Sequence, residues 1–185
     1  VGGDNADSEV FGSMTGNNGG LPNIGSGTFT LSSSNTNWNG DTTINGGTLR
    51  ATAFSVPWGS ELLLANTAGA PFAAAHAGVE RLAGLSGGGT TGGTVSLISG
   101  STLQAGFGNA TSQFDGVITG AGALDKIDSG TLTLGGANTF TGDTTITAGT
   151  LKLAHSDALQ NSTLTSATGL DFGTLTSANL GGLSG

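Results

Sequence analysis

The chain has 185 residues, of which 36 are glycine and only 9% are charged. Its twelve acidic and four basic residues give a formal net charge of −8 at pH 7, and the four cations are too scattered to neutralise a row of phosphates, which argues against a nucleic-acid partner. Cysteine is absent, so disulfides, thiolate metal sites and a cysteine nucleophile are excluded.

The N-terminal segment is acidic. Asp4 to Glu9 offers oxygen ligands for calcium but lacks the glycine and terminal glutamate of an EF-hand loop, so the sequence leaves calcium binding there open. The chain begins at Val1 without the basic and apolar regions of a signal peptide, and we expect it to be a fragment of a longer precursor. The longest apolar run, Leu62–Ala65, is too short to span a bilayer.

Short strands with one buried face are predicted along the whole chain. Threonine alternates with apolar residues at 27–31, 42–44, 47–50, 130–134, 142–146 and 149–153, which is the period of a half-buried β-strand. The apolar members are predicted to point into one continuous core, and they are Phe29, Leu31, Ile44, Leu49, Leu132, Leu134, Ile146, Leu151 and Leu153. Helical spacing is nearly absent, because glycine and proline interrupt the best candidate at 65–85.

Four blocks of this pattern recur in the same order roughly 100 residues later, which indicates an internal repeat. The first three blocks begin at Gly27, Gly40 and Gly47, and their copies begin at Gly130, Gly142 and Gly149. The fourth, Leu82–Gly87, matches Leu180–Gly185. We therefore predict one β-solenoid domain over residues 1–185, with two degenerate repeats at about 24–126 and 127–185.

Two all-β architectures accommodate such strands: an antiparallel sandwich or meander, and a solenoid that stacks strand on strand. Most corners here are Thr, Ser or Ala followed by Gly rather than Asn-Gly hairpin turns, and this favours the solenoid. At roughly 20 residues a coil we expect about nine coils and a rod of roughly 45 Å.

The stretch Gly122–Leu151 resembles the autotransporter-associated β-strand repeat of bacterial autotransporter passenger regions. The matching positions are Gly122, Leu124, Lys126, Gly130, Leu132, Leu134, Gly136, Asn138, Phe140, Gly142, Thr144, Ile146, Gly149 and Leu151. Asp128 stands where the pattern has glycine, which puts the geometry of that corner in question. Gly27–Leu49 is a second, more degenerate copy, with Ser33 in place of a glycine.

This resemblance implies a right-handed parallel β-helix, exported through the outer membrane to the cell surface or the medium. It also implies a longer precursor with an N-terminal signal and a C-terminal barrel. In such proteins the repeat usually serves as a stalk or a secretion-assisting segment, and adhesive or enzymatic residues sit elsewhere.

Residue types used in catalysis are present but poorly arranged. His155, Ser156 and Asp157 contain the groups of a hydrolase triad, yet sequence neighbours rarely converge in that geometry and no nucleophile elbow accompanies them. Asp41 and Asp143 occupy equivalent repeat positions and are expected to shape corners. We predict no catalytic, cofactor-binding or metal-binding residue and no enzyme activity.

Several other residues have a structural and a functional interpretation. His76 is expected to be a solvated loop residue, because a pair with Glu80 at i+4 needs a helix. The glycine-rich segment Gly84–Gly93 is expected to be a mobile corner rather than a phosphate cradle. Lys126 is expected to neutralise the carboxylates beside it. Trp38 and Trp58 are placed in loops, where they clamp the coil or stack on sugars.

Three functions remain open at this stage: a noncatalytic stalk of a surface protein, a subunit of an extracellular fibre, and, most weakly, a carbohydrate-active enzyme. Strands at the ends of a solenoid leave backbone groups unpaired. We therefore expect residues near Gly185 to contact further coils of the same polypeptide or an identical subunit end to end. An adhesion ligand, whether a glycan or a protein, is not identified by the sequence.

Overall fold

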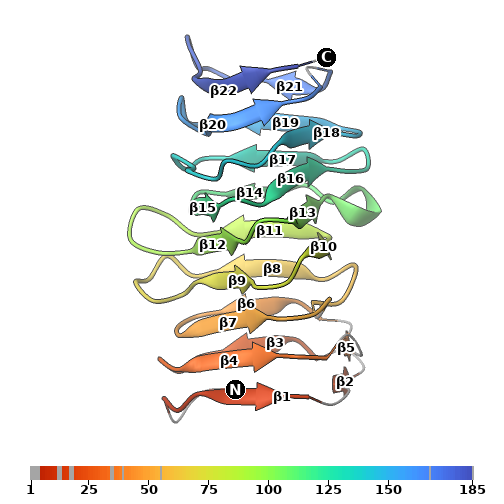
Figure 1. Cartoon of the computed structure of the whole chain (residues 1–185), viewed down its shortest axis with the longest axis vertical. Coiled ribbons are helices and arrows are strands. Elements are labelled where there is room, and N and C mark those ends of the chain that lie inside the picture. The colour runs from red at the N-terminus through yellow and green to blue at the C-terminus, as the bar shows by residue number, and fades with distance from the viewer. Residues whose placement is uncertain are drawn as a thin grey trace.

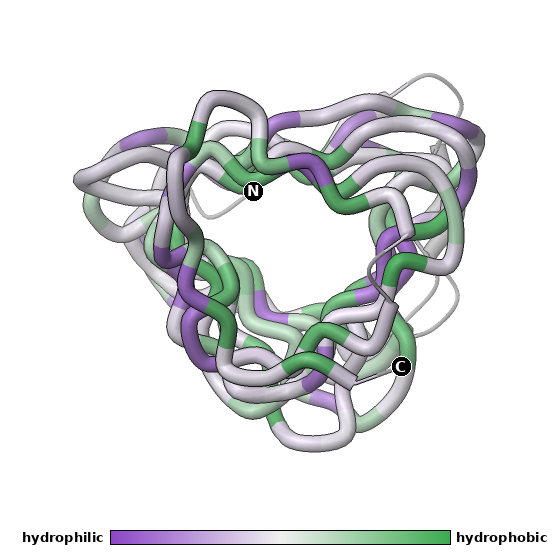
Figure 2. Tube along the Cα trace, turned by 90° about the horizontal axis from the view of Figure 1, so that it is seen from above, coloured by the Kyte–Doolittle hydropathy of each residue, from purple (hydrophilic) through white to green (hydrophobic). Residues whose placement is uncertain are grey.

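The computed structural model describes residues 5–11, 14–16, 19–33, 36–38, 40–54, 56–166 and 168–184. The chain climbs as a stack of about eight turns from the N-terminal to the C-terminal end (Figure 1). It runs to the right along the near side and to the left along the far side as it rises, so the coil is right-handed (Figure 1). Seen from above, each coil has three sides (Figure 2).

Each side of the coil is a ladder of strands, and every recorded strand pair is parallel. The first side contains β1 (Ser8–Val10), β4 (Thr28–Leu31), β7 (Thr48–Ala51), β9 (Phe72–Ala74), β12 (Thr94–Leu97) and β15 (Val117–Gly120). The second contains the pair β2 (Met14–Gly16) and β5 (Thr36–Trp38), and higher up β10 (Gly78–Leu82), β13 (Ser101–Ala105), β16 (Ala123–Lys126), β18 (Thr144–Ile146), β20 (Leu159–Leu164) and β22 (Leu180–Leu183).

The third side is the longest ladder. It contains β3 (Leu21–Asn23), β6 (Thr42–Ile44), β8 (Glu61–Leu64), β11 (Gly84–Gly87), β14 (Ser112–Phe114), β17 (Thr131–Leu134), β19 (Thr150–Leu153) and β21 (Leu170–Asp171). One short 3-10 helix, η1 (Phe107–Asn109), is inserted between β13 and β14. The parallel pairing confirms the predicted all-β solenoid and excludes the antiparallel alternatives.

The predicted core is confirmed. All nine apolar residues predicted to face inward belong to a single cluster of buried side chains that runs through the stack, and Leu134, Leu151 and Leu153 are fully buried. In β17 the threonines alternate with the inward leucines and are half-buried on the outside, whereas Thr42 of β6 and Thr144 of β18 are buried. Burial of one apolar face therefore determines which way each strand is turned.

The coils differ in length, and the expectation of nine coils was too high by about one. Equivalent residues in adjacent coils are 20 apart at Gly40 and Ser60, 23 apart at Arg81 and Gln104, and 27 apart at Leu85 and Ser112. The longest step contains η1, which accommodates additional residues at a corner without breaking the ladders on either side.

Asn138 explains one position of the repeat pattern. Its side chain is buried; its Oδ1 accepts a hydrogen bond from the Ile118 backbone N–H at 2.8 Å, and its Nδ2 donates to the Ala158 carbonyl at 2.9 Å. One amide therefore links the coil below to the coil above at a point where its own segment forms no strand. The requirement for one acceptor and one donor accounts for asparagine here.

Candidate functional site

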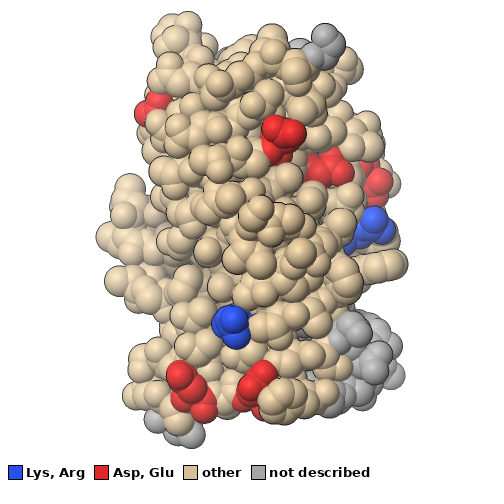
Figure 3. All heavy atoms as spheres, in the orientation of Figure 1, with Lys and Arg blue, Asp and Glu red and all other residues tan. Residues whose placement is uncertain are grey.

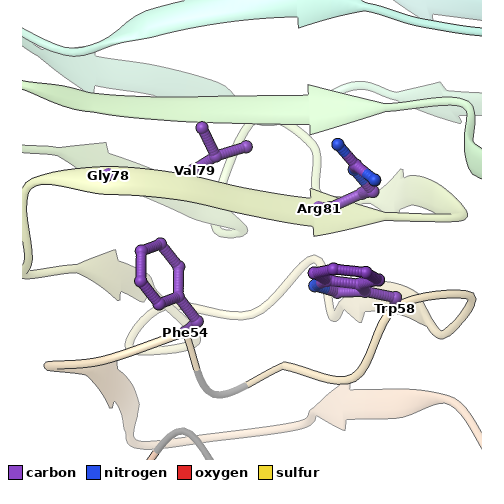
Figure 4. Close-up of a pocket in the computed structure, with 5 residues that line it drawn as sticks. All are labelled: Phe54, Trp58, Gly78, Val79 and Arg81. Carbon is purple, nitrogen blue, oxygen red and sulfur yellow. The ribbon is translucent and has the colours of Figure 1, made fainter.

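A groove on the second side of the coil is lined by exposed aromatic residues. The loop between β7 and β8, of which residues 52–54 and 56–60 are described, lies below β10, and Phe54 and Trp58 rise from it toward β10 (Figure 4). Gly78, Val79 and Arg81 of β10 complete the lining of a groove of about 290 Å³. Trp58 is 66% exposed and Phe54 is 48% exposed.

The loop that carries these aromatic residues is anchored by buried groups. The backbone N–H of Val56 donates to Glu80 Oε1 at 2.7 Å, and Val56 and Glu80 are both buried. At the end of the loop, the Ser60 hydroxyl donates to the Gly40 carbonyl of the coil below at 3.0 Å. These bonds attach the loop to the coil above and to the coil below, so the groove is preorganised.

His76 does not have the solvated position that the sequence predicted. It lies in the loop before β10, but its side chain is only 9% exposed, and its Nε2 is 3.8 Å from Glu80 Oε2. Its ring also packs edge-on against Phe54, with the ring centroids 4.9 Å apart. The interpretation was wrong because it required a helix for the approach to Glu80, whereas the corner before β10 brings the two residues together instead.

Gly78 gives Phe54 the room it occupies. A Cβ on Gly78 would lie 2.7 Å from Cε1 of Phe54, and the glycine has a φ of +139°, which side chains rarely adopt. The Phe54 ring therefore covers the lower edge of β10 at this point. Glycine at position 78 is explained by this contact.

Arg81 is held in place by three neighbours. Its guanidinium carbon lies 5.0 Å from the centroid of the Trp58 ring and 5.9 Å from that of Phe107, a residue of η1. Its Nε donates to Gln104 Oε1 at 2.9 Å. Stacking of a guanidinium on an indole stabilises both groups.

A polar ladder continues from Arg81 up the outer surface. Gln104 Nε2 donates to Asp125 Oδ2 at 3.0 Å, and the Thr147 hydroxyl donates to Asp125 Oδ1 at 2.7 Å. With a cation on one side and a carboxylate on the other, the amide of Gln104 has one favourable orientation. Gln104 on β13 lies between Arg81 on β10 and Asp125 on β16, so one strand separates the two charges.

The structure separates the two tryptophans. Trp38 is the last residue of β5 and therefore not a loop residue. Its side chain is buried, and its Nε1 donates to Thr42 Oγ1 at 3.3 Å. Trp58 remains a loop residue and is exposed. Of the two interpretations offered from the sequence, packing within the coil fits Trp38, and an exposed stacking surface fits Trp58.

The His155 group lies at a corner before β20. The Nδ1 of His155 accepts a hydrogen bond from the backbone N–H of Asp157 at 3.0 Å, and its distance to Asp157 Oδ2 is 4.0 Å. Asp157 Oδ1 accepts from the amide of Asn179 in the next coil at 2.6 Å. His155 thus contacts its own corner, Asp157 joins two coils, and the absence of a catalytic role for this tripeptide stays a prediction.

Acidic residues of the lower coils bind backbone groups of the coil above. Asp7 Oδ1 accepts from the Thr28 N–H at 2.6 Å, and Asp41 Oδ1 accepts from the Glu61 N–H at 3.2 Å. Asp4, the first residue of the possible calcium cluster, lies outside the described residues. Among the residues described, no group of three His, Asp or Glu side chains is placed to hold a metal ion.

Lys126 does not pair with the neighbouring carboxylates, contrary to expectation. Its side chain is fully buried, and its Nζ donates to the backbone carbonyls of Ile127, Asp128 and Ala148 at 2.5, 2.9 and 3.4 Å. Burial lowers the pKa of Lys126, while the charges of Asp128 and Asp125 raise it in part. The lysine of the repeat pattern is thus a buried donor that closes a corner.

Two glycine-related expectations are also decided. Asp128, which stands in place of a glycine, adopts a φ of +54°, and its Oδ2 accepts from the Gly108 N–H at 2.9 Å. The corner keeps its left-handed conformation because aspartate tolerates it. Gly84–Gly93 is only partly a corner, because Gly84–Gly87 forms β11 and pairs with β8.

Sequence reasoning did not find Phe54, Arg81 and Phe107 as neighbours. They lie in three different coils, and their proximity depends on where the loop of 52–60 and η1 interrupt the ladders. The available signal is the loss of strand alternation at 52–60 together with two aromatic residues in that interval.

Charged residues are dispersed on the surface. On the face shown in Figure 3, acidic and basic side chains are few and form no continuous stripe of one sign. No helix among the described residues is long and apolar enough to cross a membrane. The groove is therefore distinguished by its aromatic lining together with a single arginine.

Comparison with known proteins identifies the repeats. The Passenger-associated-transport-repeat family matches residues 24–51 and 124–153. A stretch of 66 residues is 47% identical to the protein named "Adhesin BmaC autotransporter" of Brucella suis biovar 1 (strain 1330), covering 33% of this chain and 2% of that protein. No solved structure matches the chain significantly. The resemblance to an autotransporter passenger region with repeats is confirmed.

Proposed function

Because the chain carries repeats of autotransporter passengers, we propose that it is a noncatalytic stalk segment of such a protein, exported through the outer membrane and displayed outside the cell. The chain spans about 2% of the length of the curated relative it matches, so any role of the whole protein is also proposed here. The relative's name contains the word adhesin, which agrees with display at a surface.

The observation that supports a stalk most directly is the uninterrupted core. Inward residues from Phe29 to Leu164 belong to one buried cluster, so neighbouring coils support each other along the axis. A stack of this kind keeps a fixed direction over its whole length, which suits it to carry other regions away from a surface.

Removing one coil in register tests this role in the full-length precursor. Thr131 and Thr150 are partners in adjacent coils, so deletion of residues 131–149 places Thr150 where Thr131 was. A stalk should tolerate this change, and surface display, measured with an antibody on intact cells, should stay close to that of the parent protein. Deletion of residues 131–139 is the matched control, because it shifts inward side chains away from the core and should reduce display strongly.

The outcome also separates the alternatives. Loss of display after the in-register deletion would contradict a stalk and favour a specific secretion-assisting role for the second repeat. Loss of glycan hydrolysis with display intact would favour an enzyme. Unchanged adhesion and display of the in-register variant would support the stalk.

A further inference from the structure

We propose that the groove formed by Phe54, Trp58, Val79 and Arg81 binds an acidic saccharide, a pyranose that carries a carboxylate. The apolar C–H face of the sugar would lie against the aromatic rings, and the carboxylate would pair with the terminal nitrogens of Arg81. This site goes beyond the stalk role and does not depend on it.

The apolar wall of the groove is exposed and is supported by contacts with neighbouring residues. Phe54, Trp58 and Val79 are 48%, 66% and 37% exposed, in a chain whose outer surface is otherwise rich in Thr, Ser, Asn and Gly. The Val56 to Glu80 hydrogen bond fixes the loop, and the His76 ring supports Phe54 from the side. A preformed aromatic wall binds a sugar ring without first having to order itself.

Arg81 supplies the charge that selects an acid. Its Nε is used by Gln104, which leaves the two terminal nitrogens to form the fork that matches a carboxylate. The ion pairs recorded among the described residues join histidines to carboxylates, and none includes Arg81. Gln104 stands between Arg81 and Asp125, so the carboxylate of Asp125 does not occupy the guanidinium.

The surroundings favour a saccharide over a peptide. An extended peptide would have to pair with the lower edge of β10, but Phe54 covers that edge at Gly78, and the Val56 N–H is bound to Glu80. Gln104, which accepts from Arg81 at the groove, keeps one amide hydrogen and one lone pair for hydroxyl groups. Polar groups beside an apolar stacking surface are what a polyhydroxylated ring requires.

The net charge of −8 limits how the ligand binds. It repels an acidic saccharide at long range, although salt near 0.15 M screens charges beyond about 8 Å. Recognition must therefore come from contact with Arg81 rather than from steering. Binding should be weak, and moderate salt should not abolish it.

A matched pair of sugars tests the proposal on the 185-residue chain. The probes are cellobiouronic acid and cellobiose, which differ by a carboxylate in place of a hydroxymethyl group. Titration is followed by the NMR signal of the Trp58 indole N–H, with the buried Trp38 indole as an internal reference. We expect Trp58 to shift with both sugars, and the acid to bind about tenfold more tightly than cellobiose.

Four variants define the site. Arg81→Gln should remove the preference for the acid and leave cellobiose binding unchanged. Trp58→Ala should remove binding of both sugars. Because this variant lacks the Trp58 indole, its titration is monitored by the NMR signals of the remaining groove residues. The matched controls are Arg50→Gln, an exposed arginine on β7, and Phe172→Ala, an exposed aromatic residue near the upper end. Both controls should bind like the parent chain, and thermal melting checks that every variant is folded.

Any of the following results would overturn the proposal. No shift of Trp58 with either sugar would exclude the site, as would equal binding by the Arg81→Gln variant and the parent chain for the acid. Binding of a short acidic peptide such as Ala-Glu-Phe at Trp58, without binding of the sugars, would assign the groove to a protein ligand instead.

Discussion

Lys126 shows how one buried side chain closes a corner of the coil. Three backbone carbonyls converge on its Nζ, two of them from its own corner and one from the coil above. A Cβ on either Gly106 or Gly149 would approach the same nitrogen to 2.8 Å, so these glycines leave space for the ammonium group. Lysine and glycine positions of the repeat pattern therefore depend on each other.

Replacing Lys126 should destabilise the fold. The Lys126→Met variant keeps most of the side-chain volume but leaves one buried and two part-buried carbonyls without this donor, so its free energy of unfolding should fall by about 1–3 kcal/mol. Lys152→Met, on the outer side of β19, is the control and should change stability by less than about 0.5 kcal/mol. Urea denaturation measures both, and equal stability of the two variants would contradict the role of Lys126.

The parent chain and the Lys126→Met variant should also differ in how their stability depends on pH. Burial lowers the pKa of Lys126 below its ordinary value of 10.5, so between the lowered pKa and 10.5 the unfolded chain binds more protons than the folded chain. The unfolding free energy of the parent chain should therefore rise with pH in this window, relative to that of Lys126→Met. A difference that falls as pH rises toward 10.5 would show that the pKa is raised instead.

At the scale of the strand and its corner, close approach of adjacent coils determines where glycine is needed. A Cβ on Gly136, just after β17, would lie 1.9 Å from the carbonyl oxygen of Gly116 in the coil below, and one on Gly116 would lie 1.9 Å from that of Gly93. The three glycines form a column along which the backbones are in direct contact. At Gly116 and Gly136 side chains are excluded by distance rather than by φ, whereas Gly93 also has a φ of +72°.

Adding one methyl group to this column should be costly. Gly136→Ala forces two coils apart locally, and its free energy of unfolding should fall by about 1–3 kcal/mol. Gly19→Ala, in a segment where a Cβ meets nothing within 4 Å, is the matched control and should be neutral or slightly stabilising. Chemical denaturation of the two variants decides this, and similar losses in both would argue against a packing cause.

Most of the strands were predictable, and the groove was not. Threonine and leucine alternate in β17 and β19 because one face is buried, and this pattern is visible in the sequence. The inward turn of Trp38 and Lys126 was missed, because a large aromatic residue or a lysine next to polar neighbours does not continue the aliphatic pattern. The contact of Trp58 with Arg81 depends on the length of the intervening coil, which local pattern does not encode.

At the scale of the whole molecule, the upper end of the stack is less well covered than its middle. Leu183 of β22 is 66% exposed, and Leu170, Leu175 and Leu180 are only partly buried against the core. β21 and β22 are the last strands of their ladders. Gly185, which was expected to contact further strands, lies outside the described residues. We propose that another coil of the same polypeptide, or a second copy, packs on this end.

This proposal predicts association of the isolated 185-residue chain. Its average mass, measured by sedimentation equilibrium, should rise with concentration, since partly covered leucines and unpaired strand edges favour contact between ends. Leu183→Lys should weaken association, whereas Leu63→Lys, at an exposed site in the middle of the stack, should not. A chain that stays monomeric up to millimolar concentration would contradict the proposal.

The pairing of each strand only with its neighbours above and below has a mechanical consequence. Tension applied between the two termini acts first on a terminal coil, whose ladders are bonded on one side, while inner coils are bonded on both. The stack should therefore yield by peeling, one coil after another, rather than by rupture as a unit. Each step would release about 20 residues, or roughly 70 Å of extended chain, so the rod can lengthen under load while the remaining coils keep their shape.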